Sequence, residues 1–214
     1  MITVRYLNVN ELVHSFSYNE FIQLVENLSE QNRTTGPDQS EKKLKFTLLN
    51  HHRLKRINKT LKLELDTLVA FQNFQGRLTW LVIVEAWCGD VAQNLPYINA
   101  MSQLNKHIDL KLILKSDYPE IMEQFLTEGT ESIPKLICIN REDHEVLGTW
   151  GSRPAEAKQM VSDFKINQII SKAELLENIQ KWYNLNKGMF IQQEFRTLLL
   201  DWQKKMPYKK EKIE

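Results

Sequence analysis

The residues best suited to chemistry are Trp87-Cys88-Gly89-Asp90, which place a thiol between an expected strand and an expected helix. The short apolar run 80–84 is rich in β-branched side chains, which predicts a buried strand. Apolar residues at helical spacing over 95–104 predict the helix. A helix N-terminus presents unpaired N–H groups and a positive dipole, and both favour a thiolate over a thiol. We therefore expect Cys88 to be a nucleophile.

Two carboxylates near Cys88 act in the opposite direction. A negative charge close to a thiol disfavours the thiolate, and both Glu85 and Asp90 are close to Cys88 in the sequence. Asp90 is also a residue type that capping and the helix dipole favour in a first turn, and we prefer this interpretation to a catalytic one. We interpret Glu85 as a solvated side chain at the strand end, with a proton shuttle as the alternative.

The composition is that of an ordinary globular protein. The 214 residues are 42% apolar and 26% charged, and the formal net charge of +1 gives no footprint for nucleic acid or an anionic membrane. No apolar stretch reaches the roughly 18 residues that span a bilayer, and residues 1–5 lack the basic start of a signal peptide. Two cysteines make neither a disulfide framework nor a zinc site. We expect a cytoplasmic protein without metal or cofactor that binds neither nucleic acid nor membrane.

Strands and helices alternate around the cysteine, whereas both flanks are helical. Ser17 and Glu20 have the form of a capping box ahead of the first helix. Ser152 is the expected N-cap of a later helix with Pro154 in its first turn. The expected helices cover about 18–28, 40–58, 64–73, 117–126, 152–164, 172–186 and 190–204, the expected strands about 80–84, 108–115, 135–140 and 145–150, and alternation over 2–6 predicts a short strand or an extended arm.

This order of elements and several short motifs resemble the thioredoxin superfamily. Trp87-Cys88-Gly89 stands where thioredoxins carry Trp-Cys-Gly-Pro-Cys, and Pro96 stands where they carry a helix-kinking proline. Ile133-Pro134, directly before a strand, resembles the cis-proline that faces the active-site cysteine, and Gly148 resembles a family glycine. The resemblance implies an α/β fold with a thioredoxin-like central mixed sheet and added N- and C-terminal helices.

The resemblance covers about residues 74–165, and it divides the chain into three parts. We expect 1–73 to be a helical extension packed on this domain and 166–214 to be a second helical extension. More narrowly, Trp-Cys-Gly-Asp followed by Ala-Gln resembles bacterial thioredoxin-family proteins with helical extensions, many of unassigned function. The resemblance implies that the backbone before the cis-proline pairs with an extended substrate. The substrate-binding residues that it implies are Trp87, Gly89, Asp90, Ile133 and Pro134.

Two residues depart from the thioredoxin pattern. Val91 stands where the second cysteine of the family would fall, and Val82 stands where the family carries a buried acid. Cys138 cannot replace the missing thiol, because four strand residues place it roughly 13 Å from Pro134. A disulfide needs Cα atoms within about 7 Å, so Cys138 is expected to be a small buried hydrophobe.

Three functions fit these residues. The leading hypothesis is a single-thiol disulfide oxidoreductase, in which Cys88 attacks a protein or small-molecule disulfide and an external, low-molecular-weight thiol resolves the intermediate. The alternative is a redox-inactive binding or chaperone-like module that uses the cis-proline groove. A third hypothesis is a redox sensor in which oxidation of Cys88 changes helix packing. The sequence does not specify an oligomeric state.

Arg153 and the basic stretch 51–56 are each open to a functional and a structural interpretation. Arg153 could bind the carboxylate of a small thiol, or it could be a solvated first-turn residue. The basic stretch 51–56 is most simply a solvated helix face, and its two adjacent histidines point about 100° apart and make a poor metal pair.

Overall fold

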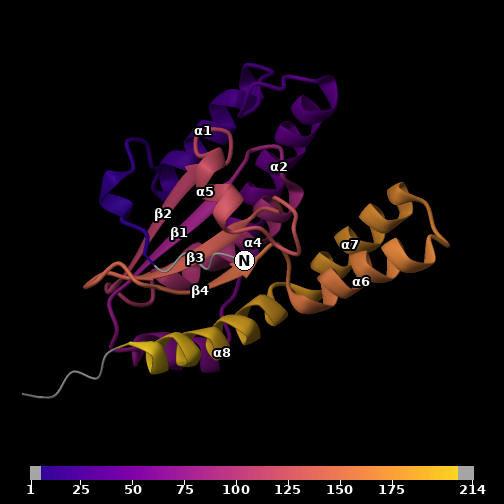
Figure 1. Cartoon of the computed structure of the whole chain (residues 1–214). Helices are drawn as coiled ribbons and strands as arrows, with labels where there is room; N and C mark the ends of the chain where they lie inside the picture. The colour runs from indigo at the N-terminus through magenta and orange to yellow at the C-terminus, as the bar shows by residue number, and fades with distance from the viewer. Residues whose placement is uncertain (1–5, 207–214) are drawn as a thin grey trace, which may run out of the picture.

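The computed structural model describes residues 6–206 and is built on a four-stranded mixed sheet (Figure 1). All seven residues of β1 (Leu78–Val84) are buried, as its continuous apolar run predicts. Its neighbours are β2 (Ile108–Leu114), which runs parallel to it, and β3 (Lys135–Asn140), which runs antiparallel. The hairpin partner of β3 is β4 (Val146–Gly151), which completes the order β2-β1-β3-β4. The predicted α/β class with a central mixed sheet is confirmed.

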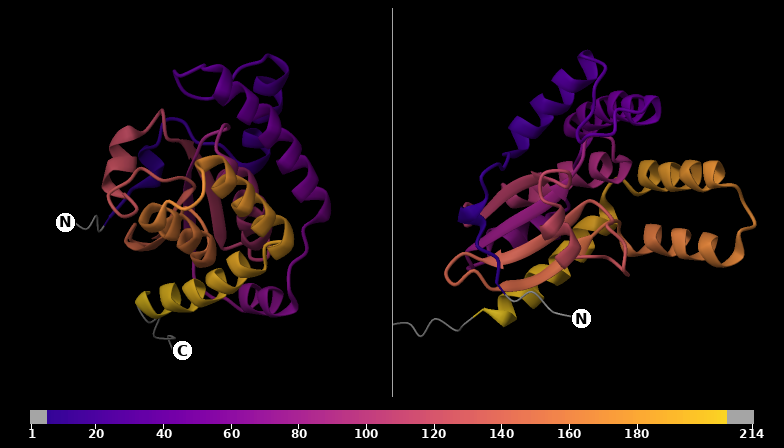
Figure 2. Two further views of the ribbon diagram at one scale, coloured as in Figure 1. Left: turned by 90° about the vertical axis from the view of Figure 1, so that its right-hand side faces the viewer. Right: turned by 45° about the horizontal axis from the view of Figure 1, so that its top comes forward.

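Helices cover the sheet and extend beyond it. The crossover from β1 to β2 is α4 (Gly89–Ser102), which contains Pro96. In Figure 2 the hairpin formed by α6 (Ala155–Asn167) and α7 (Lys172–Asn186) extends away from the sheet. The helices are α1 (Tyr18–Glu30), α2 (Glu41–Thr60), α3 (Leu65–Gln72), α4, α5 (Pro119–Gln124), α6 (Ala155–Asn167), α7 (Lys172–Asn186) and α8 (Met189–Lys205), with a short 3-10 helix η1 (Val9–Glu11).

The N-terminal helices are joined to the sheet by local signals and by a backbone bridge. The predicted capping box at Ser17 and Glu20 is present at the start of α1. Just before it, Phe16 exchanges two backbone hydrogen bonds of 2.8 Å with Leu112 of β2. This bridge covers part of the exposed edge of β2, where free N–H and C=O groups invite pairing with other chains. Of the expected N-terminal strand, residues 1–5 lie outside the described residues, and Tyr6 forms an isolated bridge with Glu145.

The C-terminal helix α8 is part of the hydrophobic core. Its Phe195 and Trp202 are almost fully buried and pack edge-on against Trp80 of the central strand, with ring centroids 5.2 and 6.0 Å away.

Helix α8 also corrects the expected N-cap of α6. The N-cap of α6 is Pro154 rather than Ser152, and Glu194 of α8 accepts the hydrogen bond of the Ala155 N–H. Within residues 6–206, no helix is long and apolar enough to cross a membrane.

Truncation of Phe195 tests whether α8 belongs to the cooperative core. Phe195→Ala removes a ring with no exposed surface and leaves a cavity beside Trp80, so we expect unfolding to require about 3–5 kcal/mol less free energy. Urea unfolding measures the loss. Leu200→Ala is the matched control on the same helix: its side chain is 59% exposed, and we expect a change below about 0.5 kcal/mol. Similar losses in both variants would contradict the assignment.

Candidate functional site

Cys88 lies at the N-cap of α4, at the edge of a cavity of about 610 Å³. Only 8% of its surface is exposed, and its Sγ donates a hydrogen bond to the carbonyl oxygen of Ile133 at 3.3 Å. The peptide bond between Ile133 and Pro134 is cis. The structure therefore brings together the cysteine and the Ile133-Pro134 pair, which are 45 residues apart in the sequence.

The end of β4 packs closely against this pair. A side chain at Gly151 would place a Cβ atom only 2.2 Å from the carbonyl oxygen of Pro134. Gly151 also has a φ of +141°, in a region that L-residues with side chains rarely adopt. Glycine at this position lets the backbone of β4 approach Pro134.

Burial and a neighbouring carboxylate keep the Cys88 thiol protonated. Burial is the larger cause and the negative charge of Asp90 the second, and together they raise the pKa of Cys88 to about 12. The backbone N–H groups of Val91 and Asp90 and the charge of Arg153 act in the opposite direction and do not compensate. At neutral pH the group is therefore a thiol that donates its hydrogen, in agreement with its contact to Ile133.

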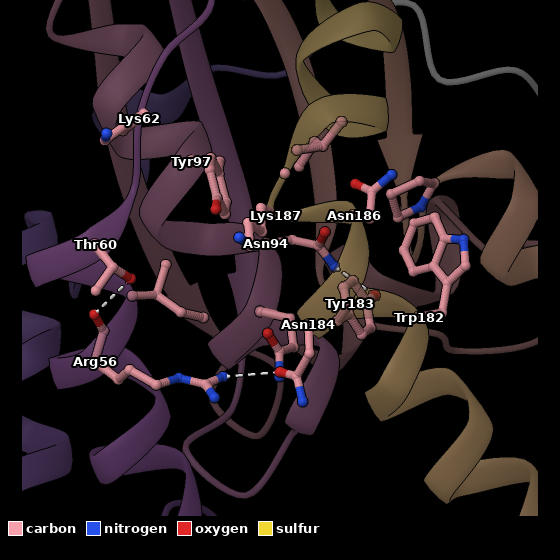
Figure 3. A pocket seen from close by; sticks show the side chains of 15 residues that line it. Arg56, Thr60, Lys62, Asn94, Tyr97, Trp182, Tyr183, Asn184, Asn186 and Lys187 are labelled. Carbon is pink, nitrogen blue, oxygen red and sulfur yellow. Dashed lines mark hydrogen bonds between the residues drawn. The ribbon is translucent and has the colours of Figure 1, made fainter.

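Asp90 is the centre of a network rather than a simple first-turn residue. Its carboxylate forms an ion pair with Arg153, with an Oδ2–Nη2 distance of 2.5 Å, and accepts a hydrogen bond from the Tyr183 hydroxyl at 3.0 Å. Tyr183 in turn accepts a hydrogen bond from Asn94 at 2.9 Å, drawn as a dashed line in Figure 3. Arg153 is thus engaged by Asp90, which corrects the expectation of a free or solvated arginine. Burial raises the pKa of Asp90, and Arg153 opposes this shift.

Comparison with known proteins identifies the family. A family model described as Thioredoxin matches residues 36–165, which is more than half of the chain. The chain belongs to the thioredoxin superfamily. The matched range begins within the segment 1–73 that we expected to be an extension, and the division at residues 73 and 165 stays a prediction.

Two solved structures resemble this thioredoxin-family chain. One is the crystal structure of an HIV epitope-scaffold, with 17% sequence identity, a TM-score of 0.53, and coverage of 86% of this chain and 98% of that chain. The other is a protein of unknown function from Pseudomonas aeruginosa, with 19% identity, a TM-score of 0.47, and coverage of 81% and 99%. At 17% identity the likeness to the epitope-scaffold extends to the fold alone. No curated protein matches the chain.

Glu85, next to the thioredoxin motif, is buried, which corrects its interpretation as a solvated side chain. Only 2% of its surface is exposed. Its carboxylate accepts hydrogen bonds from the Ser116 N–H at 2.8 Å and from the Thr35 hydroxyl, and Thr35 accepts one from the Ala86 N–H. A buried carboxylate needs such partners to offset its desolvation. Glu85 thereby joins the loop before Cys88 to the N-terminal segment and to the end of β2.

Helix α2 supplies site residues that sequence reasoning missed. Lys43 places its Nζ 4.4 Å from the ring centroid of Trp87, a cation–π contact. Asn50 is buried and donates to the carbonyl of Ala86 at 2.9 Å, and it accepts a hydrogen bond from Arg53 at 3.1 Å. The Arg53 guanidinium lies beside Gly89, 3.2 Å from where a Cβ atom would be. The only sign of these residues in the sequence is that polar side chains such as Asn50 occur on the side of α2 that the structure buries.

The remaining thiol takes no part in the site. Cys138 is fully buried in β3 opposite Trp80, as expected of a small hydrophobe. Both cysteines are free, and residues 6–206 contain no cluster of three or more His, Cys, Asp or Glu side chains that could hold a metal ion. Trp87, Gly89, Asp90 and Ile133 line the same cavity as Cys88.

Truncation of Glu85 tests its role as the anchor of the loop before Cys88. Glu85→Ala leaves the buried Thr35 hydroxyl and the Ser116 N–H without their acceptor. Each buried group without a partner destabilises the folded state by about 1–3 kcal/mol. We therefore expect the free energy of unfolding, measured by urea titration, to fall by about 2–4 kcal/mol. Glu120→Ala, at an exposed position of α5, is the control and should change it by less than about 0.5 kcal/mol. An unchanged Glu85→Ala variant would rule out the anchor.

Removal of the Asp90 charge should make the thiol more reactive. Because the pKa of Cys88 is raised to about 12, the rate of alkylation by iodoacetamide in a Cys138→Ser background should still be rising with pH at about pH 10. Asp90→Asn removes the negative charge and leaves that of Arg153, so the pKa falls and the profile moves to lower pH. A fall of one unit gives about tenfold more thiolate at about pH 8. Asp201→Asn, on the exposed face of α8, should leave the profile unchanged, and a profile of Asp90→Asn that matches it would disprove the coupling.

Proposed function

We propose that this protein is a thioredoxin-fold binding protein that docks an extended polypeptide segment in the groove between Trp87 and Ile133. The observation that carries the proposal is the hydrogen bond from the Cys88 thiol to the Ile133 carbonyl, beside the Asp90 carboxylate. This arrangement keeps the groove of the family while it holds the thiol in its unreactive, protonated form.

The groove offers both parts of a strand-addition site. The Ile133 N–H has no hydrogen-bond partner within residues 6–206, and so it is available to the main chain of a bound segment. Side chains of such a segment would meet the half-buried Trp87 ring and the apolar side chains of Phe46, Leu176 and Ile179, which line the same cavity. Main-chain pairing supplies affinity in this mode, and side-chain pockets supply selectivity.

The protonation state of Cys88 argues against rapid exchange chemistry. A thiol with a pKa of about 12 is ionised in about one molecule in 10⁵ at neutral pH, and the thiolate is the attacking species. Val91 also leaves the protein without a resolving thiol in the motif. Both facts favour binding over turnover.

A single-thiol oxidoreductase is the second candidate, and the position of Cys88 in the wall of an open cavity favours it. In this reaction the Cys88 thiolate attacks one sulfur of a protein or small-molecule disulfide, and the other sulfur leaves as a thiolate. The thiolate of a low-molecular-weight thiol then attacks the substrate sulfur of the mixed disulfide, so that a new disulfide forms between these two sulfurs and Cys88 leaves as a thiolate. We propose the cytoplasm as the compartment of this protein, and the thiols of the cytoplasm would provide the reductant.

Peptide selection with matched variants separates the two functions. Peptides selected from a random displayed library on the wild-type protein should bind Cys88→Ser with a Kd within about twofold, because the thiol is not needed for docking. Trp87→Ala should weaken the same peptides about tenfold, which corresponds to about 1.4 kcal/mol. Trp182→Ala replaces a half-buried tryptophan outside this cavity and is the control for general loss of structure.

The outcomes distinguish the candidates directly. Peptides that depend on Cys88 and carry a cysteine captured as a mixed disulfide would support exchange and refute the binding proposal. Binding that is insensitive to Trp87→Ala would exclude the groove as the docking site.

A further inference from the structure

A second cavity of about 450 Å³ lies between α2, α4 and the turn from α7 to α8 (Figure 3). Its volume is in the range of small-molecule sites. It shares only Gln93 and Tyr183 with the cavity of Cys88, and neither the family motif nor the thiol contributes to it. Its lining residues include Arg56, Lys62, Tyr97, Trp182, Asn184 and Lys187.

The charges that line this cavity are all positive. Arg56 comes from α2, Lys62 from the loop after it, and Lys187 from the turn before α8. No Asp or Glu of the described residues lines the cavity, although the whole chain has 28 basic and 27 acidic residues. None of the three cations forms an ion pair within residues 6–206, and the side-chain partner of Arg56 is the neutral amide of Asn184 at 3.2 Å. Three cations that line one cavity without a counter-charge make its potential positive, which favours a bound anion.

A tyrosine hydroxyl adds a directional group to these charges. Tyr97 of α4 is only 7% exposed, and its hydroxyl has no hydrogen-bond partner among the described residues. Figure 3 shows this hydroxyl turned toward the interior of the cavity. Because no protein group occupies this hydroxyl, it can donate or accept a hydrogen bond with a ligand in the cavity.

Gly188 permits this placement of the tyrosine. Its φ of +76° is in the left-handed region that favours glycine, and a Cβ atom there would lie 2.2 Å from the Tyr97 ring. The turn into α8 can therefore close over Tyr97 only with glycine at this position. The preceding Lys187 is also left-handed, with a φ of +50°, so the sharp turn directs the chain and its lysine to the rim of the cavity.

We propose that this cavity binds a small phosphate ester, with the phosphate held by Arg56, Lys62 and Lys187 and hydrogen-bonded by the Tyr97 hydroxyl. A phosphate monoester carries close to two negative charges at neutral pH and three acceptor oxygens, which match three cations and one hydroxyl better than a singly charged carboxylate does. The half-buried Trp182 ring and Ile57 and Ile191 supply apolar surface for the rest of the molecule.

Phenyl phosphate is the probe for this site, because it combines a phosphate monoester with an apolar ring. Isothermal titration calorimetry on the full-length protein should give a Kd tighter than about 1 mM, and benzoate and inorganic phosphate should both bind more weakly. Tighter binding of benzoate would replace the phosphate ester with a carboxylate and overturn the proposal. Equal binding of inorganic phosphate and phenyl phosphate would show an adventitious ion only.

Substitutions of residues that line the cavity test the location of the site. The double variant Arg56→Gln and Lys187→Gln should weaken phenyl phosphate at least about tenfold, and Tyr97→Phe about threefold. The matched control is Lys55→Gln with Lys59→Gln, which removes two exposed cations of α2 that do not line the cavity and should change Kd less than about twofold. Equal weakening in both double variants would indicate general charge attraction and overturn the proposal. Because Cys88 lies outside this cavity, Cys88→Ser should bind phenyl phosphate normally even if the groove proves to have a different function.

Discussion

Asp90 places a carboxylate at the partly buried start of α4, and three separate parts of the chain are ordered around it. Arg153 comes from the loop after β4, Tyr183 from α7, and Asn94 from the next turn of α4. A buried carboxylate is destabilising unless charges and hydrogen bonds compensate for lost hydration. The compensation of Asp90 therefore helps to hold the α6–α7 hairpin against α4, together with the hydrogen bonds from Gln93 to Gln180 and from Arg56 to Asn184.

Burial and, after it, the same carboxylate decide the protonation state of the thiol. A helix N-terminus stabilises a thiolate by about 2 kcal/mol at most. The rise of the Cys88 pKa from 9.0 to about 12 corresponds to roughly 4 kcal/mol in favour of the thiol. Burial and Asp90 therefore outweigh the helix terminus. The position of the cysteine follows the thioredoxin pattern. Its protonation state is set by its burial at the start of α4 and by the charge of Asp90.

The parts of this structure that the sequence could predict depend on neighbouring residues. Apolar periodicity places β1 and α4, and the capping box starts α1. The contact of Cys88 with the Ile133-Pro134 pair is the exception, because it was implied by the family resemblance and not by a local pattern. The errors all involve distant partners. The Glu85 carboxylate accepts a hydrogen bond from Thr35, 50 residues earlier. The Ala155 N–H at the start of α6 donates to Glu194, 39 residues later. A local pattern contains no information about which distant side chain will neutralise a charge, so buried charges were interpreted as solvated ones.

Helix α2 shows how one basic stretch acquires two different environments. Arg53 and Arg56 are three residues apart and so share a face, which is turned toward α4, whereas Lys55 lies on the solvent side. Along that face Arg53 reaches the cavity of Cys88 and Arg56 reaches the second cavity. Tyr183 stands in the wall between them, bonded to Asp90 on one side and to Asn94 on the other. Tyr183 is therefore a wall that both cavities share, although they have no charged group in common.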